Sequence, residues 1–134
     1  MVSTIVARYA DGRTVKGTSL DVAQDRPNCH VRTADGDMVE VELKDLKALF
    51  FVKTLDGNKA HVEGDAIIPS DPRLRGAKLV EIKFYDGERI VGLAMRYPPN
   101  KPYFFLVPVD PKSNNLRVLV NQAQVGSMGV VAGA

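Results

Sequence analysis

The sequence predicts an all-β chain of two homologous five-stranded small barrels or half-barrels, packed together, with at most one or two short helical turns. Two observations support this prediction. A stretch near the N-terminus recurs in the second half with the same turn residues: Asp11-Gly12 falls on Asp86-Gly87, and Gly17 falls on Gly92. In addition, no segment shows helical periodicity beyond one or two turns.

The internal repeat divides the chain. Residues 5–17 match residues 80–92 in hydrophobic pattern, and the spacing is preserved until an insertion within 110–115. A single insertion in a turn, with otherwise preserved spacing, indicates duplication. We therefore assign three segments: a first β repeat at 1–54, a linker at 55–76 and a second β repeat at 77–134.

Each copy is expected to begin with a hairpin, because an Asp-Gly pair between β-branched and aromatic residues is a strong turn signal. Gly17 and Gly92 then interrupt the second strand, which is typical of a bulge or tight bend. One helical turn is predicted at Lys44–Lys47. The later strands are predicted at Cys29–Thr33, Met38–Leu43 and Ala48–Lys53, and at Tyr103–Val107, Leu116–Asn121 and Val125–Val131.

Two of these strands are apolar on both faces, which indicates burial on both sides or contact with a partner. A barrel of about 50 residues buries only about 60% of its unfolded surface, so it is marginal alone. Packing of the two halves against each other would remedy this. The residues expected at that contact are Leu49, Phe50, Phe51, Phe104 and Phe105.

The segment between the copies reads as a structured linker. Its glycines and prolines, including Gly57, Gly64 and Pro72, indicate turns and loops. Within it, Ala60–Ile68 is predicted to form a short extra strand. At the other end of the chain, the uncharged strand from 127 to 134 has no Lys or Pro to guard its edge. We expect it to be covered by the first half through Leu49–Val52, or to pair in a homodimer, so the chain is a monomer or homodimer.

Composition is that of a soluble globular protein, with 45% apolar and 25% charged residues. The single cysteine, Cys29, cannot form an internal disulfide and favours a reducing compartment. The longest apolar run, Ala48–Val52, is too short to cross a membrane, and no secretory signal pattern is present. These features predict a cytoplasmic protein without a membrane partner.

No arrangement of residues predicts catalysis. Cys29 and His30 are neighbours in a predicted strand, so their side chains point to opposite faces and cannot form a nucleophile–base pair. The other histidine, His61, lies in the linker. Two histidines and one cysteine without ligand spacing do not predict a metal site, and no cofactor motif occurs. The expectation is therefore a non-enzymatic protein with no metal and no cofactor.

One loop combines aromatic, proline and cationic side chains, which are common at binding hot spots. It is predicted to bind a protein partner, and its residues are Tyr97, Pro98, Pro99, Lys101, Pro102 and Tyr103. With 18 basic and 16 acidic residues, the chain lacks the dense basic stripe of nucleic-acid-binding domains. Nucleic acid is accordingly not the expected partner.

Distant resemblances leave two alternatives open. The predicted strand pattern resembles SH3-like barrels, and Asp11–Gly17 resembles the first motif of Sm-like proteins, which implies RNA binding; the second, Arg-Gly motif of that family has no counterpart. Asp71–Arg75 loosely resembles the arginine arm of PilZ domains, which implies a response to cyclic di-GMP, but their Asp-x-Ser-x-x-Gly strand does not occur.

A closer resemblance covers almost the whole chain. It depends on Asp25–Pro27, Leu46–Lys53 and Asp110–Asn115, whose Lys-Ala-Leu-Phe-Phe-Val and Asp-Pro-Lys-Ser-Asn-Asn sequences are not generic for strands. They are similar to an uncharacterised family of short bacterial proteins of the deltaproteobacterial type, found alone or near signalling proteins. The resemblance implies an adaptor or regulatory role in bacterial signalling, and it assigns no functional residue.

Overall fold

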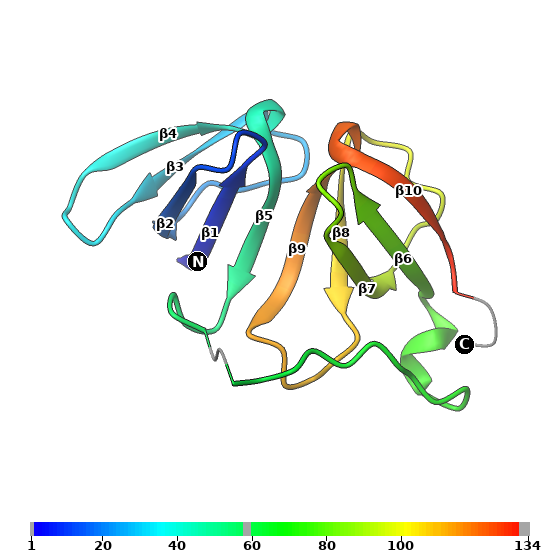
Figure 1. Ribbon diagram of the computed structural model, residues 1–134. Coiled ribbons are helices and arrows are strands. Elements are labelled where there is room, and N and C mark those ends of the chain that lie inside the picture. Colours follow the sequence, from blue (N-terminus) through cyan, green and yellow to red (C-terminus); the bar gives the residue numbers. More distant parts are fainter. Residues whose placement is uncertain (1, 58–59, 132–134) are drawn as a thin grey trace.

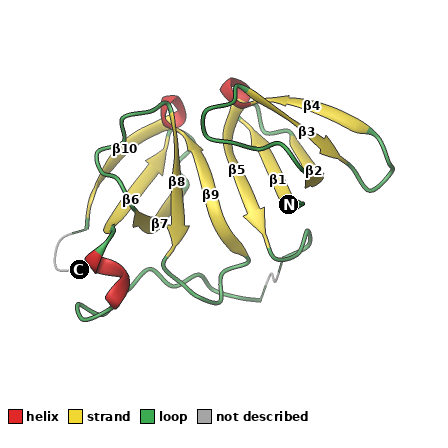
Figure 2. Ribbon diagram, turned by 180° about the vertical axis from the view of Figure 1, so that it is seen from behind, coloured by secondary structure: helices red, strands yellow, loops and turns green. Residues whose placement is uncertain are grey.

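The chain folds almost entirely into β-strands, as predicted (Figures 1 and 2). The computed structural model describes residues 2–57 and 60–131. Its strands are β1 (Ser3–Tyr9), β2 (Thr14–Ser19), β3 (Asn28–Arg32), β4 (Met38–Glu42), β5 (Leu46–Val52), β6 (Lys78–Phe84), β7 (Arg89–Ala94), β8 (Tyr103–Pro108), β9 (Asn115–Asn121) and β10 (Val125–Val130). The described residues contain no α-helix, and the all-β prediction is confirmed.

The described residues form three short 3₁₀ turns, one more than predicted: η1 (Leu43–Asp45), η2 (Pro72–Arg75) and η3 (Gln122–Gln124). The η3 turn precedes β10 as η1 precedes β5. The Asn121 side chain stabilises it by accepting a hydrogen bond from the Ala123 amide. Asp71 does the same for η2, where Pro72 occupies the first helical position.

All ten strands belong to one antiparallel sheet in the order β10-β6-β7-β8-β9-β5-β1-β2-β3-β4. Each half uses the same internal order, with its last strand beside its first. The halves join because β9 pairs with β5, placing Leu119 opposite Leu49. Two separate closed barrels are not confirmed, since the sheet is continuous and its ends, β4 and β10, do not pair with each other.

The C-terminal strand does not cover the first half. β10 pairs with β6, whereas β5 has β1 and β9 as its neighbours. The expected cover through Leu49–Val52 is therefore wrong for the described residues 125–130. β9 occupies that position because its Val118, Leu119 and Val120 offer the apolar partners that the glycine-containing β10 lacks. Residues 132–134 lie outside the described residues.

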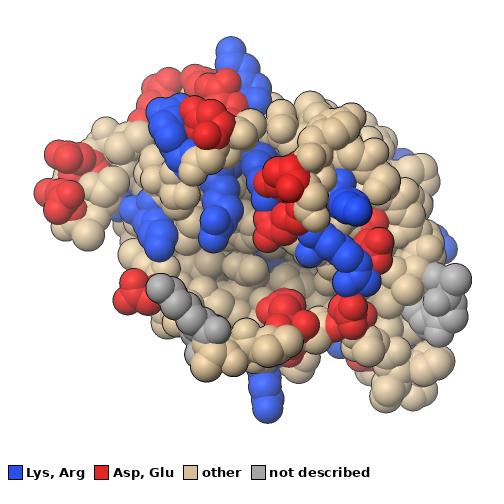
Figure 3. Space-filling view, viewed as in Figure 1, with Lys and Arg blue, Asp and Glu red and all other residues tan. Residues whose placement is uncertain are grey.

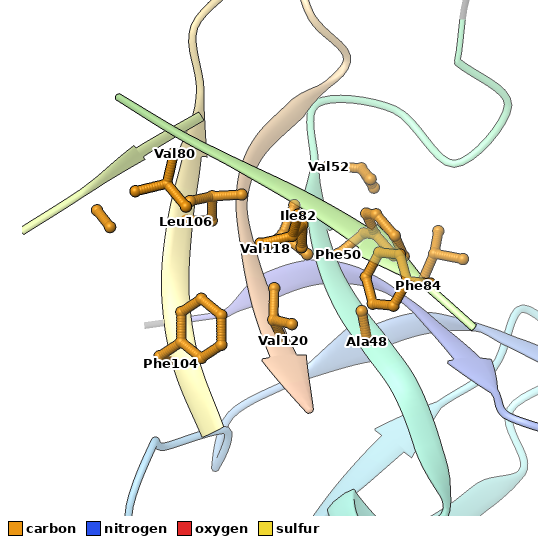
Figure 4. Packing of buried hydrophobic residues seen from close by; sticks show 12 residues of the cluster. Ala48, Phe50, Val52, Val80, Ile82, Phe84, Phe104, Leu106, Val118 and Val120 are labelled. Carbon is orange, nitrogen blue, oxygen red and sulfur yellow. The ribbon is translucent and has the colours of Figure 1, made fainter. Parts of the chain in front are cut away.

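The central strands β8, β9 and β5 carry apolar residues on both faces, and each face belongs to a different core. One core contains Ala48, Phe50, Val52, Phe104, Leu106, Val118 and Val120 together with β6 residues such as Ile82 and Phe84 (Figure 4). The other core combines Leu49, Phe51 and Leu119 with Ile5, Val31 and Val41 of the first half, and Phe105 packs against it. The three strands thus act as a wall shared by both halves.

The five residues expected between the halves all lie on this shared wall. Phe51 and Phe105 approach with ring centroids 6.0 Å apart. The Arg117 guanidinium lies 4.2 Å from the Phe51 centroid and 4.4 Å from that of Phe105. On the opposite face, Phe50 and Phe104 are both 5% exposed. The two faces therefore bury their aromatic rings in different cores.

The two hairpins have the turn chemistry that the sequence predicts. Gly12 and Gly87 have φ of 97° and 95°, which only glycine adopts without strain. Beside them, Asp11 accepts a hydrogen bond from the Arg13 amide, and Asp86 accepts one from Glu88.

Gly17 and Gly92 have another role. The β1–β2 and β6–β7 registers contain no bulge. Instead, a Cβ at Gly17 would lie 2.1 Å from the Arg32 carbonyl oxygen, and one at Gly92 would lie 2.6 Å from that of Val107. Each glycine lets the next strand pass close to the second strand of its half.

The linker contains no strand among its described residues, so the extra strand predicted at Ala60–Ile68 is wrong. The polar residues of this segment interact with side chains rather than with a strand edge: Asp65 receives a hydrogen bond from Arg89, and His61 contacts Asp110. Further on, Ile67 and Leu74 pack against a small core of Leu79, Val91, Leu93 and Val109. The linker thus follows the second half as an irregular segment (Figure 1).

Candidate functional site

The loop predicted to bind a partner connects β7 to β8 and lies beside β10 (Figure 2). Pro98, Lys101 and Pro102 are exposed, and Pro99 is half-buried. The Gln24 side chain, from the first half, donates a hydrogen bond to the Tyr103 carbonyl at 2.9 Å. The loop is therefore held by contacts with both halves.

The two tyrosines of this loop point inward rather than into solvent. Tyr97 packs against the core behind β10 and donates a hydrogen bond to the Met128 carbonyl at 3.4 Å. Tyr103 packs against the core of the first half, where burial raises its pKa. Both residues are half-buried and position the loop, and Tyr97 also lines the larger of two cavities beside it.

Two adjoining cavities open on the outer side of the loop. One has a volume of about 390 Å³ and reaches Gln24, Phe104 and Phe105; the other, of about 670 Å³, reaches η2 and the start of β6. They share the residues Met95, Arg96, Pro99 and Asn100. Met95 lies between the two cavities and is 81% exposed, so its apolar side chain is available for contact.

The charge around the two cavities has a single sign. Arg75, Lys78, Arg96 and Lys101 line them and are exposed, and no acidic residue is among the described lining residues. Within residues 2–57 and 60–131, none of these four cations has a salt-bridge partner. On the face seen in Figure 1, by contrast, acidic and basic side chains are interspersed (Figure 3).

The sequence prediction missed several residues of this site. Met95 and Arg96 precede the predicted segment by one or two positions. Arg75 and Lys78 come from the linker and the start of β6, and the fold brings them to the second cavity. The sequence feature that could have pointed to Arg75 was the Arg73-Leu-Arg75 cluster before the second repeat. The structure separates the two arginines of that cluster, because the Arg73 guanidinium is bound by Asp71 at 2.9 Å.

Cys29 and His30 are separated by the strand, with Cys29 1% exposed in the core of the first half. Burial raises the pKa of the Cys29 thiol to about 11, which disfavours the thiolate at neutral pH. His30 lies on the outer face, where its Nδ1 is 2.7 Å from Asp21 Oδ2 and its Nε2 is 3.6 Å from Glu40 Oε2. The Cys29 thiol and the His30 imidazole therefore lie on opposite faces of the strand.

A protein-family model matches nearly the whole chain. The model of a family of unknown function (DUF6982) matches residues 1–132. The chain belongs to this family. No curated protein and no solved structure matches it. Among the described residues, no helix is long and apolar enough to cross a membrane.

The Asp110–Asn115 segment serves as a structural clamp in this member of the family. Asp110 accepts hydrogen bonds from the amides of Gly64 and Lys112, at 2.8 and 2.9 Å. Asn114 accepts a hydrogen bond from the Thr54 amide and donates one to the Thr54 carbonyl. The segment thereby ties Thr54, just before the linker, and Gly64, within it, to the turn between β8 and β9.

Within the part of the chain that the structure describes, one group of side chains could hold a metal ion. His61, Glu63 and Asp110 each offer one ligand atom, and these three atoms lie within 4.8 Å of one another. The spacing of histidines and cysteines in the sequence did not indicate such a site, because two ligands come from the linker and the third from the turn after β8.

Proposed function

We propose that this protein is a non-enzymatic adaptor module in bacterial signalling or regulation, and that the cavities beside the β7–β8 loop bind an acidic segment of a protein partner. The observation that carries the proposal is the set of four unpaired cations, Arg75, Lys78, Arg96 and Lys101, around an exposed Met95. Unpaired cations attract carboxylates, and an exposed methionine adapts to varied apolar side chains.

A protein partner fits these cavities better than RNA does. Proteins that bind single-stranded RNA offer exposed aromatic rings on which bases stack. Here Tyr97 and Tyr103 face the cores, and the exposed apolar group is the thioether of Met95. The inward rings favour the adaptor function over the Sm-like RNA-binding alternative. The engagement of Arg73 with Asp71 weighs in the same way against a PilZ-like nucleotide site.

The proposal is tested with labelled peptides that alternate acidic and apolar residues, followed by fluorescence anisotropy. The double variant Arg96→Glu/Lys101→Glu should weaken binding at least about tenfold, equivalent to about 1.4 kcal/mol. The matched control, Arg32→Glu/Lys44→Glu, makes the same charge change at exposed cations that line neither cavity, and it should bind as the wild type does. Because the attraction is electrostatic, binding should also weaken with added salt.

The alternatives give different outcomes in the same assay. If a single-stranded RNA or a cyclic dinucleotide binds more tightly than every acidic peptide, the adaptor function is wrong and the matching alternative replaces it. If both double variants lose peptide binding equally, the attraction depends on net charge and not on these cavities. If instead only Arg96→Glu/Lys101→Glu loses peptide binding, cross-linking in cells through a photoreactive group at position 95 would identify the natural partner.

A further inference from the structure

The group of His61, Glu63 and Asp110 converges on one point. His61 Nε2 lies 2.8 Å from Asp110 Oδ2 and 3.9 Å from Glu63 Oε1. The Asp110 side chain is only 11% exposed and that of His61 23% exposed, whereas that of Glu63 is 49% exposed. Two ligands are therefore well shielded, and the third stands at the open side.

Asp110 is held in place for a ligand role. Its Oδ2 accepts the Gly64 amide at 2.8 Å and its Oδ1 accepts the Lys112 amide at 2.9 Å. These two backbone hydrogen bonds fix the orientation of the carboxylate, as surrounding hydrogen bonds orient the ligands of a metal ion.

The other histidine shows why this cluster differs from an ordinary surface ion pair. His30 also has two carboxylates beside it, but Asp21 contacts its Nδ1 and Glu40 contacts its Nε2. One ion cannot bind both carboxylates and the ring there, because the two nitrogens point in different directions. At His61, both carboxylates face the same nitrogen.

We propose that His61, Glu63 and Asp110 bind one zinc ion. Zinc binds imidazole nitrogen and carboxylate oxygen at about 2.0–2.2 Å, so ligand atoms around a tetrahedral ion lie about 3.4 Å apart. The two separations from His61 Nε2, 2.8 and 3.9 Å, lie on either side of that value. Two carboxylates balance the charge of the ion, and the imidazole selects zinc over magnesium or calcium.

Binding would tie the linker to the turn between β8 and β9. His61 and Glu63 belong to the irregular linker, and Asp110 lies in the turn after β8, two residues beyond its end. An ion shared by the two segments stabilises the folded chain in proportion to its affinity, because the unfolded chain does not hold the three ligands together. The site is independent of the proposed adaptor function, since none of its residues lines the cavities beside the β7–β8 loop.

The test is a calorimetric titration of zinc into the metal-free full-length chain at pH 7.5. The wild type should bind one equivalent and melt at a higher temperature with zinc. Glu63→Gln and His61→Gln should weaken binding at least about tenfold. Glu63→Gln is the decisive variant, because Glu63 is exposed and pairs with His61, so the fold should remain intact. The matched control, His30→Gln, should bind zinc as the wild type does.

The location is checked by backbone NMR, in which zinc should shift the Gly64 and Lys112 amides that contact Asp110. Absence of stoichiometric binding by the wild type would overturn the proposal. Equal losses in the His30 and His61 variants would also overturn it, because binding would then be unspecific. If magnesium binds as tightly as zinc, the imidazole is not a ligand and the assignment fails.

Discussion

His30 and Asp21 form a hydrogen-bonded pair on the outer face of β3, and each shifts the pKa of the other. The bond from the His30 ring raises the pKa of His30 and lowers that of Asp21 to about 2. Asp21 is held further by the His30 amide and the Ser19 hydroxyl. The stabilisation from His30 is therefore full below about pH 6.5 and is lost as pH rises through its raised pKa. That from Asp21 is present above about pH 4 and is lost as pH falls through about 2.

Asp21→Asn should lower the pKa of His30 towards its ordinary value of about 6.5, because the carboxylate that favours the imidazolium is removed. The measurement is an NMR titration of the His30 ring protons. Glu40→Gln is the matched control and should lower the pKa less, since Glu40 lies 3.6 Å from the ring and Asp21 lies 2.7 Å from it. An equal fall in both variants would contradict the assigned cause.

Alanine substitutions at Gly17 and Gly92 test the close approach of each glycine to the neighbouring strand. Gly92→Ala places a Cβ against the Val107 carbonyl and the Leu106 side chain, and should destabilise the fold by about 1–3 kcal/mol. Gly17→Ala should cost at least as much, because the distance to Arg32 is shorter. Gly129→Ala on β10 is the control, since nothing lies within 4 Å of its added Cβ. Urea unfolding measures all three, and equal stability of the Gly92 and Gly129 variants would refute the close approach.

At the scale of elements, two equivalent strand pairs differ in the polarity of one face: that of β8 and β9 is apolar, and that of β3 and β4 is polar. Phe105 of β8 pairs with Leu119 of β9, and both contribute to the core of the first half. The corresponding cross-strand pair of β3 and β4 is His30 and Glu40, which is exposed. The polar pair protects β4 as a free edge strand, because charged residues disfavour pairing with another chain.

The double variant His30→Phe/Glu40→Leu should therefore self-associate. It gives β3 and β4 the apolar outer face that joins β8 and β9 to the first half. Light scattering should report a higher mass than for the wild type at the same concentration. Asp56→Leu/Lys112→Leu adds two apolar side chains at exposed positions outside β3 and β4 and serves as the control. An unchanged mass of the first variant would mean that charge on this face does not prevent association.

At the scale of the whole molecule, Lys47 links the halves in addition to the pairing of β5 with β9. It lies at the start of β5, its side chain is 12% exposed, and its Nζ is 2.7 Å from Asp86 Oδ2 and in contact with Glu88. The same ammonium lies 4.7 Å from the Phe84 ring centroid. Burial opposes its charge, but the two carboxylates outweigh this effect and raise the pKa of Lys47. The first half is thus fastened to the β6–β7 hairpin.

Lys47→Met should lower the free energy of unfolding by about 1–2 kcal/mol, because the ion pairs and the cation–π contact are lost while the apolar stem remains. Denaturant unfolding measures the change. Lys78→Met is the control: Lys78 is exposed and has no salt-bridge partner among the described residues, so the effect should stay within about 0.5 kcal/mol. Equal stability of the two variants would show that the Lys47 contacts do not help to join the halves.

Part of the fold and of the site could be read from local sequence. Asp11-Gly12 and Asp86-Gly87 form their hairpins because a turn depends on a few adjacent residues. The strand expected at Ala60–Ile68 does not form, because the side chains there find partners on Arg89 and Asp110 rather than a free edge. At the candidate site, the prolines and Lys101 were visible in the sequence, whereas the inward direction of Tyr97 and the arrival of Arg75 were not.

By itself, the sequence determined the all-β class and the position of almost every strand, because alternation, turn residues and β-branched content act over a few residues. It also marked Leu49–Phe51 and Phe104–Phe105 as buried on both faces. Only the tertiary structure decided that β9, and not β10, lies beside β5, because strand choice depends on which apolar faces match across 70 residues of chain. The same long-range packing brings His61 to Asp110 and four cations around Met95. Such convergence depends on the path of the backbone, which no local pattern encodes.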